Sequence, residues 1–195
     1  MTPRSPSTAR RARRPPASFS VSAATRPVSA AAPHIATMPA ASCIALLEAH
    51  TVGRMAYSFH DRVDITPIHY VYHDHWLFAR TSHGKKMTSV RHVPWVAFEV
   101  DEIRAVFEWQ SVVVHGTVYR MAPDGGPVEA RLWRTGIELL KRIVPDTGTE
   151  RDPVPYRSLV FGIHVDSMSG RSCSPVPAPL ATRGRAAAGV KTARA

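Results

Sequence analysis

Residues 107–121 restrict the fold of this chain more than any other stretch. As an extended strand, they would place side chains alternately on two faces. One face would carry Val112, Val114, Gly116 and Val118, and the other Val113, His115, Thr117 and Tyr119. Both faces are largely apolar, so we expect both to be covered. A strand of this length predicts a protein built around a β-sheet.

Shorter segments on either side continue this organisation. Strands are predicted at residues 52–59, 63–72, 75–81, 96–101 and 159–165, with a hairpin turn at His73-Asp74. Helical spacing appears at residues 39–49, between Gly84 and Pro94, and at residues 127–144. Six strands with single helices between them predict a mainly β protein, a small antiparallel barrel.

The positive charge of the chain lies at its two ends. The net charge is +10, but residues 1–34 and 171–195 together carry +11, and residues 35–170 carry −1. We expect disordered basic tails at residues 1–37 and 172–195 and a folded domain at residues 38–171. Residues 1–37 also fit an organelle transit peptide, or an extension upstream of a start at Met38. Because the charge is in the tails, no nucleic-acid partner is expected.

Several classes of protein are not supported by the sequence. No run of 18 apolar residues is present, so no membrane span is expected. Cys43 and Cys173 are too few for a disulfide scaffold, and a cytoplasmic location is the simplest expectation. On an extended strand His69, His73 and His75 would lie on one face, which is an arrangement that could hold a metal ion. Asp74, however, lies where the hairpin should turn and would break this shared face. We therefore expect no metal site.

Residues 78–87 are the first candidate for a binding site. They pass from a strand into a helix through hydroxyl groups, a glycine and two lysines. Thr81 and Ser82 can donate hydrogen bonds, and Lys85 and Lys86 add charge beside the free N–H groups of the helix start. This combination predicts a site for a phosphate monoester. The alternative is a solvated lysine pair on a surface helix.

Residues at the head of the long strand are the second candidate. Trp109 can cover an aromatic plane, and Gln110 can hydrogen-bond the edge of a heterocycle, next to the hydroxyl of Ser111. The alternative role for Trp109 is packing in the core or in a dimer interface.

A proline within a strand gives the third candidate. Pro67 lies between Thr66 and Ile68, and proline cannot donate to a strand ladder. The strand is therefore expected at an edge or at a bulge, with neighbouring backbone groups free for a ligand. The alternative is a simple edge strand.

Together the three segments resemble the pyridoxamine 5'-phosphate oxidase-like, FMN-binding split-barrel family, particularly its small members related to 5-nitroimidazole reductases. The resemblance covers residues 42–171. It is carried by residues 46–56, Gly84-Lys85-Lys86, residues 96–101, residues 109–116 and residues 163–171. It implies a six-stranded antiparallel split β-barrel of the Greek-key type that forms a homodimer with FMN at the interface. Deazaflavin or haem, which relatives of this barrel also hold, remain alternatives.

The resemblance also implies a role for each segment. Lys85, Lys86, Thr81 and Ser82 look like the FMN phosphate site. The backbone around Thr66, Pro67 and Ile68 looks like the edge that contacts the isoalloxazine ring. Trp109, Gln110 and Ser111 resemble the strand that completes the flavin pocket from the second subunit.

The activity implied is hydride transfer between FMN and a small or xenobiotic molecule, with His69 as a candidate proton donor. A non-catalytic flavin-, deazaflavin- or haem-binding module for sensing, transport or storage is the alternative. Arg80 departs from the histidine that nitroimidazole reductase relatives often carry there, so that substrate is not supported. No Trp and Arg pair follows Arg171 to hold pyridoxal phosphate, so a role in vitamin synthesis is not expected.

Overall fold

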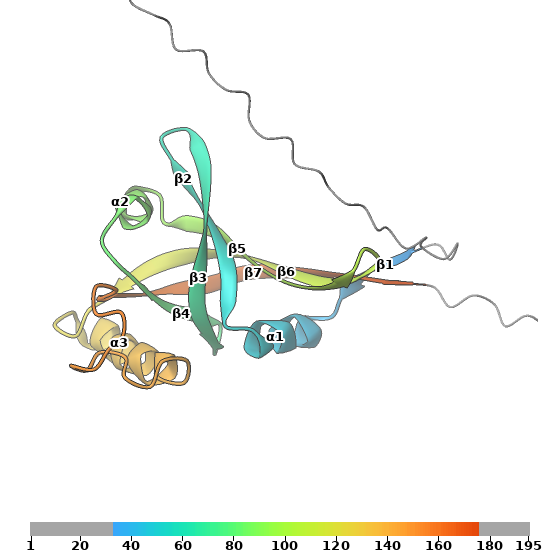
Figure 1. The fold of residues 1–195 in the computed structure, drawn as a ribbon. Helices are drawn as coiled ribbons and strands as arrows, with labels where there is room; N and C mark the ends of the chain where they lie inside the picture. Colours follow the sequence, from blue (N-terminus) through green and yellow to red (C-terminus); the bar gives the residue numbers. More distant parts are fainter. Residues whose placement is uncertain (1–32, 176–195) are drawn as a thin grey trace, which may run out of the picture. The chain divides into compact units, whose positions relative to one another are not determined.

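The computed structural model describes residues 33–175, and the disorder expected for the remainder of both tails lies outside these residues. The described part has seven strands and three helices (Figure 1). The strands are β1 (Pro33–Met38), β2 (Val52–Phe59), β3 (Arg62–His73), β4 (Trp76–Thr81), β5 (Trp95–Ala105), β6 (Glu108–Met121) and β7 (Leu159–Pro175). The helices are α1 (Ala40–Ala49), α2 (Lys85–His92) and α3 (Pro127–Leu140). None of these helices is long and apolar enough to cross a bilayer.

Six of the strands close into an antiparallel barrel. The order in the sheet is β1-β7-β4-β3-β2-β5-β6, and β6 also pairs with β7, which closes the ring. Strands β2, β3 and β4 follow one another, and β5 returns to lie beside β2. This is the Greek-key order. The mainly β class and the six-stranded antiparallel barrel predicted from the sequence are confirmed.

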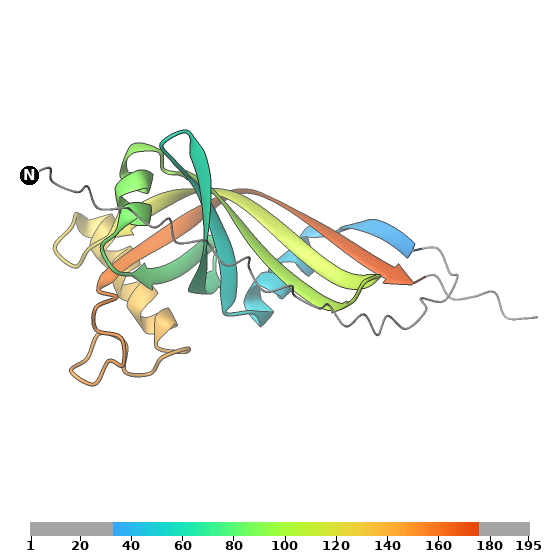
Figure 2. The same cartoon turned by 45° about the horizontal axis from the view of Figure 1, so that its top comes forward.

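The folded part extends beyond the boundaries expected at residues 38 and 171. A seventh strand, β1, pairs with β7 from Pro33 opposite Pro175 to Met38 opposite Gly170. β7, predicted to end at residue 165, continues to Pro175. β4 pairs with one edge of β7 as far as His164, and β1 pairs with the same edge from Gly170 to Pro175 (Figure 2). The sequence signal was weak there because residues 166–175 are largely polar.

Two tight hairpins connect β2 to β3 and β3 to β4. His60 and Asp61 form the first turn, with φ of 45° and 55°, and Asp74 and His75 form the second, with φ of 46° and 62°. Consecutive positive φ values are typical of the type I′ turn, which matches the twist of paired strands. The second turn lies one residue later than predicted.

Aromatic side chains fill the barrel. Tyr70 and Phe98 are fully buried and meet edge to face, with ring centroids 4.9 Å apart. The Tyr70 hydroxyl donates to the carbonyl oxygen of Leu47, 2.8 Å away, and ties α1 to the barrel. Helix α1 turns Cys43, Leu46 and Leu47 inward, as predicted.

The long strand β6 is covered on only one face within the chain. Val112, Val114 and Val118 are buried, but His115 and Tyr119 on the other face are exposed, so the expectation that both faces are covered is wrong for the single chain. The uncovered face continues across β5, β2 and β3, where the register aligns their outward residues. We call this surface the outer apolar face; it includes Val63, Ile65, Ala56, Trp95, Ala97 and Val113.

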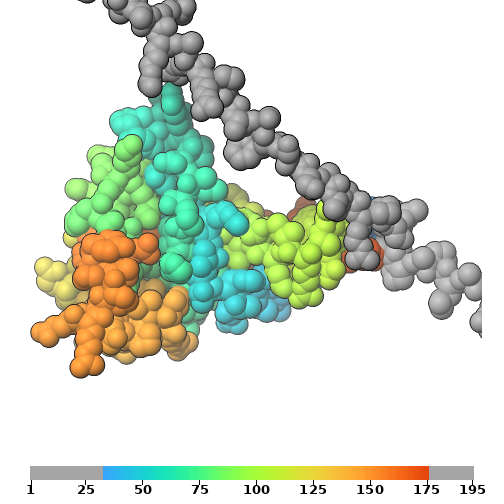
Figure 3. All heavy atoms as spheres, viewed as in Figure 1, coloured from blue at the N-terminus to red at the C-terminus, as the bar shows by residue number. Residues whose placement is uncertain are grey.

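Helix α3 is shorter than predicted. It ends at Leu140, four residues before Val144, and residues 141–158 continue as a series of turns. Its inner residues pack with Phe78, Met121 and Val160 in a second hydrophobic cluster. In the space-filling view, the orange segment that follows α3 lies on the surface next to the green segment that contains α2 (Figure 3).

Candidate functional site

The first half of β3 has a free edge. β3 pairs with β4 only from Tyr70 onward, whereas β2 pairs with β3 along its length. The Tyr70 N–H donates to the Thr51 carbonyl on the β2 side, at 2.9 Å. Because successive N–H groups point to opposite sides of a strand, the nitrogen of Pro67 points to the unpaired side. Pro67 therefore costs no ladder bond, and the predicted edge around Thr66 and Ile68 is present.

The start of α2 lies just beyond the end of β4. Thr81, buried, is the last residue of β4, and exposed Ser82 opens the turn into the helix. Gly84 caps α2, with no side-chain cap and no acidic residue in the first turn. The N–H groups of the first turn therefore present a partial positive charge with no side-chain acceptor.

The two lysines of α2 do not form a single clamp. The Nζ of Lys85 lies 5.9 Å from the ring centroid of Phe59 in β2. The Nζ of Lys86 lies 6.0 Å from the ring centroid of Phe161 in β7. The side chains extend toward different strands because adjacent positions on a helix do not face the same way. The expectation of two adjacent ammonium groups acting together is not supported.

Lys86 instead lies near a cation that the sequence analysis did not identify. Burial lowers the pKa of Lys86, and the positive charge of Arg157 lowers it further. Among residues 33–175, neither Lys86 nor Arg157 forms an ion pair. Two cations without an acidic partner are suited to bind a dianion such as a phosphate monoester.

A buried carboxylate anchors the segment that carries Arg157. Asp152 accepts hydrogen bonds from both terminal nitrogens of Arg80 in β4, with Nη2 to Oδ1 at 2.9 Å. It also accepts from the backbone N–H groups of Gly148 and Val154, at 2.9 and 3.0 Å. The Arg80 guanidinium, followed by these backbone donors, holds the pKa of Asp152 well below its usual range, against the opposing effect of burial. Arg80 is thus used to hold residues 141–158 against the barrel.

A cavity of about 270 Å³ lies between β3, β4 and this segment. We call it the β3–β4 cleft; its lining is His69, Arg80, Leu140, Ile143, Val144, Thr147, Pro153, Val154 and Arg157. Most of the lining is apolar. His69 provides an imidazole on one wall, and Arg157 provides a cation on another. Lys86, Thr81 and Ser82 are not among the lining residues.

The second predicted segment, Trp109 to Ser111, is remote from this cleft within one chain. Trp109 and Gln110 line a different cavity of about 300 Å³ near the β5–β6 turn. The Ser111 hydroxyl donates to Glu99 at 3.0 Å on the outer surface of the sheet. Helix α2 lies at the other end of the barrel (Figure 1). In one chain, residues 66–68 and 81–86 both lie just past the point where the β3–β4 ladder ends, at Tyr70 opposite Ala79, and none of them lines the β3–β4 cleft.

The histidines near the second hairpin do not gather around a common point. His75 lies in the turn with positive φ, while His69 and His73 remain in β3. In the described part of the chain, no group of three or more His, Cys, Asp or Glu side chains is placed to hold a metal ion.

Comparison with solved structures supports the same fold. A protein from Mesorhizobium loti described as FAD-binding is 30% identical, with a TM-score of 0.58, covering 72% of this chain and 99% of that chain. A Corynebacterium glutamicum protein named as a candidate pyridoxamine 5'-phosphate oxidase is 19% identical, with a TM-score of 0.54, covering 73% and 100%. A candidate 5-nitroimidazole antibiotic resistance protein from Bacteroides thetaiotaomicron is 12% identical, with a TM-score of 0.56, covering 73% and 89%.

A search of curated proteins found no match. A family model described as pyridoxamine 5'-phosphate oxidase matches residues 39–172. This range contains the barrel strands β2 to β6, all three helices and most of β7. Because the match spans well over half of the sequence, the chain belongs to the pyridoxamine 5'-phosphate oxidase family.

Proposed function

We propose that this protein is a flavin-dependent oxidoreductase that binds FMN in the β3–β4 cleft and acts on a small or xenobiotic molecule. The observation that carries the proposal is the presence of two cations without an acidic partner among residues 33–175: Lys86 in the first turn of α2, whose start has no side-chain cap, and Arg157 on the wall of the cleft. Partly buried charges are costly unless they are compensated. A phosphate monoester would compensate both, so the residues fit the terminal group of FMN.

Several parts of the chain would hold the cofactor. In this proposal Lys86 and Arg157 would bind the phosphate, and the hydroxyl groups of Thr81 and Ser82 would donate hydrogen bonds to it. Between Thr66 and Ile68, whose backbone groups point toward β2, the carbonyl oxygen of Pro67 points to the free edge and would be an acceptor for the edge of a heterocycle. A bound flavin supplies hydride transfer, whereas the protein supplies orientation and electrostatics.

The chain also provides an environment for a substrate beside the cofactor. Leu140, Val144 and Val154 give the cleft an apolar lining against which the body of a small substrate would pack. His69 lies on the wall of the same cleft and can hold a proton for transfer to a reduced substrate. Arg80 is occupied by Asp152, so its role is to position the cleft wall.

The proposed active unit is a homodimer. The outer apolar face exposes Val63, Ile65 and Trp95 at 79%, 61% and 69% of their surface. Large exposed apolar surfaces mark interaction sites. Pairing of two copies through this face would also allow residues 109–111 of one copy to approach the cleft of the other. The completed pocket would then contain Trp109, Gln110 and Ser111.

Flavin affinity tests the proposal directly. The purified chain is reconstituted with FMN or with riboflavin, which lacks the phosphate, and binding is followed by flavin fluorescence. Lys86→Ala and Arg157→Ala should each weaken FMN binding by roughly 10- to 100-fold, the equivalent of one charged hydrogen bond, and leave riboflavin binding unchanged. Lys141→Ala, which removes an exposed lysine beyond α3, is the matched control.

The outcomes separate the possible functions. FMN affinity that is unaffected in both variants, or a chain that takes up no flavin, would overturn the proposal. Reduction of the bound flavin by NAD(P)H or by a reduced deazaflavin supports an oxidoreductase. A flavin that no donor reduces indicates a binding module for sensing, transport or storage. Absorbance spectra of the purified chain distinguish FMN from deazaflavin or haem.

A further inference from the structure

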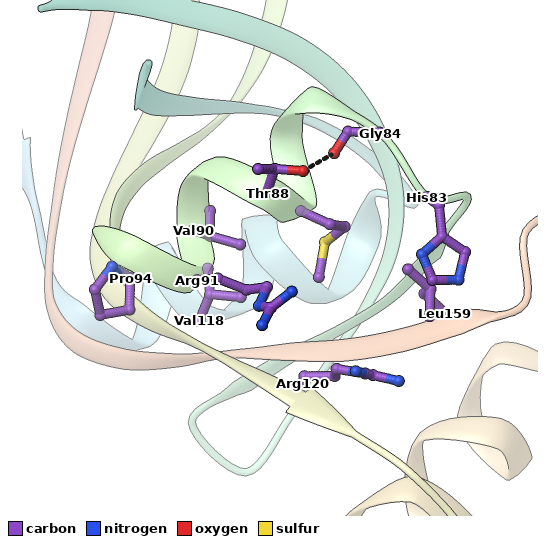
Figure 4. Close-up of a pocket in the computed structure, with 10 residues that line it drawn as sticks. His83, Gly84, Thr88, Val90, Arg91, Pro94, Val118, Arg120 and Leu159 are labelled. Carbon is purple, nitrogen blue, oxygen red and sulfur yellow. Dashed lines mark hydrogen bonds between the residues drawn. The ribbon is translucent and has the colours of Figure 1, made fainter. Parts of the chain in front are cut away.

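A second cavity lies beneath α2, outside the β3–β4 cleft. Its volume is about 340 Å³. Its lining is His83, Gly84, Met87, Thr88, Val90, Arg91, Pro94, Val118, Arg120 and Leu159. The cavity is bounded by α2 on one side and by β6 and the start of β7 on the other (Figure 4).

Two arginines give this cavity a positive charge. Arg91, in the last turn of α2, and Arg120, near the end of β6, both extend into the space between helix and strand (Figure 4). No acidic residue lines the cavity. Within residues 33–175, neither guanidinium forms an ion pair. The C-terminal dipole of α2 favours a cation at Arg91 but has no such effect at Arg120.

The floor of the cavity is apolar. Met87, Val90 and Val118 are buried there, next to Leu159. Guanidinium groups above an apolar floor suit a ligand that joins a phosphate to a flat or apolar body, because the planar forks of arginine bind phosphate in a bidentate manner. The volume is near the lower end of small-molecule pockets, roughly 300–1,000 Å³. It therefore suits a fragment the size of a mononucleotide.

The cavity adjoins the proposed flavin phosphate site. His83 and Gly84 line it, and Gly84 is also the cap residue of α2, whose first turn carries Lys86. Leu159 lines it two residues after Arg157 along the chain. A ligand with two linked phosphoryl groups would place one near Lys86 and the other beneath α2.

We propose that the cavity beneath α2 is a nucleotide-phosphate subsite, bound by Arg91 and Arg120, that takes the adenylate part of FAD or a free mononucleotide. Only the alternative in which the ligand is FAD rests on the proposed flavin function. The subsite would make this protein favour a dinucleotide flavin over FMN, a distinction that the β3–β4 cleft alone does not provide.

The ratio of FAD affinity to FMN affinity is the first measurement, made on the full chain. Arg91→Gln combined with Arg120→Gln should lower FAD affinity by roughly 10- to 100-fold and leave FMN affinity unchanged. Arg131→Gln, an exposed position on α3, is the matched control and should change neither affinity.

AMP binding in the absence of flavin is the second measurement, followed by calorimetry. AMP that binds the wild-type chain and not the double variant supports the subsite even if the chain binds no flavin. A failure of the proposed flavin function can therefore be told apart from a failure of the subsite. AMP binding with equal FAD and FMN affinities identifies a free nucleotide as the ligand. A lowered FAD-to-FMN ratio in the double variant identifies the dinucleotide. An unchanged ratio together with no arginine-dependent AMP binding overturns the proposal.

Discussion

Lys86 carries a positive charge in a place that water reaches poorly. Burial, and then the neighbouring charge of Arg157, lower the pKa of its ammonium group. Between this lowered pKa and the ordinary lysine value, the unfolded chain binds more protons than the folded chain, so folding stability rises with pH in that window. Below the lowered pKa the charge is present in both states, and its burial costs stability. The charge of Lys86 therefore does not help the chain to fold.

Replacing Lys86 should separate these two effects. Lys86→Met should raise the stability of the flavin-free protein by roughly 0.5–2 kcal/mol at pH 7, because the buried charge is removed. It should also reduce the additional stability that FMN confers on the wild-type chain, in line with the weaker FMN binding expected when Lys86 is removed. Thermal unfolding with and without FMN measures both quantities. Lys85→Met, at an exposed position, is the control, and a flavin-free Lys86→Met protein less stable than this control would contradict the argument.

The elements that build the cleft differ in how they are held. Strands β3 and β4 are fixed by ladder hydrogen bonds, whereas residues 141–158 contain no regular element and are anchored through Asp152. The side chains of Arg80 and Asp152 are only 9% and 4% exposed. Removing one partner of a buried pair leaves the other charge uncompensated. The position of Arg157 therefore depends on one ion pair with β4.

Replacing Asp152 should destabilise this segment in a pH-dependent manner. The folded pKa of Asp152 is lowered, so its contribution is complete above the unfolded value of about 3.9 and is lost as pH falls through the folded value. Asp152→Asn should cost about 3–5 kcal/mol at pH 7 and flatten the acid side of the stability profile. Urea unfolding from about pH 3 to 7 measures this effect. Asp146→Asn, an exposed position in the same segment, should stay within about 0.5 kcal/mol of wild type.

The elements with clear periodicity were predictable from the sequence. The boundaries of β2 match the prediction, and those of β3 and β4 match within one residue, because apolar alternation ends at polar turns. β1 was missed because its partner residues in β7 are distant in sequence and largely polar. Asp152 and Arg157 were missed for a related reason. Their significance comes from Arg80 and Lys86, which lie about seventy residues earlier, and no local pattern connects them.

At the scale of the molecule, the single chain leaves both an incomplete pocket and an uncovered sheet. Ala56, Val63, Trp95 and Ala97 of the outer apolar face also line a cavity of about 330 Å³. Trp109 and Gln110 lie at the far end of the same sheet. In the proposed homodimer, pairing of two copies would cover the outer apolar face and would bring Trp109 and Gln110 of one copy to the cleft of the other. Oligomerisation and flavin binding should therefore be coupled.

Disrupting the outer apolar face should therefore remove both properties together. Trp95→Glu places a charge where an apolar side chain is 69% exposed, and it should convert a dimer into a monomer with weakened FMN binding. Sedimentation velocity, with and without FMN, measures the oligomeric state. Val128→Glu, at a position 62% exposed on α3, is the control. A Trp95→Glu protein that stays dimeric and binds FMN normally would show that the face has another role.

The placement of β1 on β7 has a consequence for self-association. Residues 170–175 of β7 have β6 on one side for part of their length and only β1 on the other. A chain begun at Met38 would expose these backbone groups, and exposed strands recruit further strands from other molecules. The short segment from Pro33 to Thr37 pairs this length of β7 and becomes the edge strand in its place, with Pro33 at one end, where no N–H is available to a further strand.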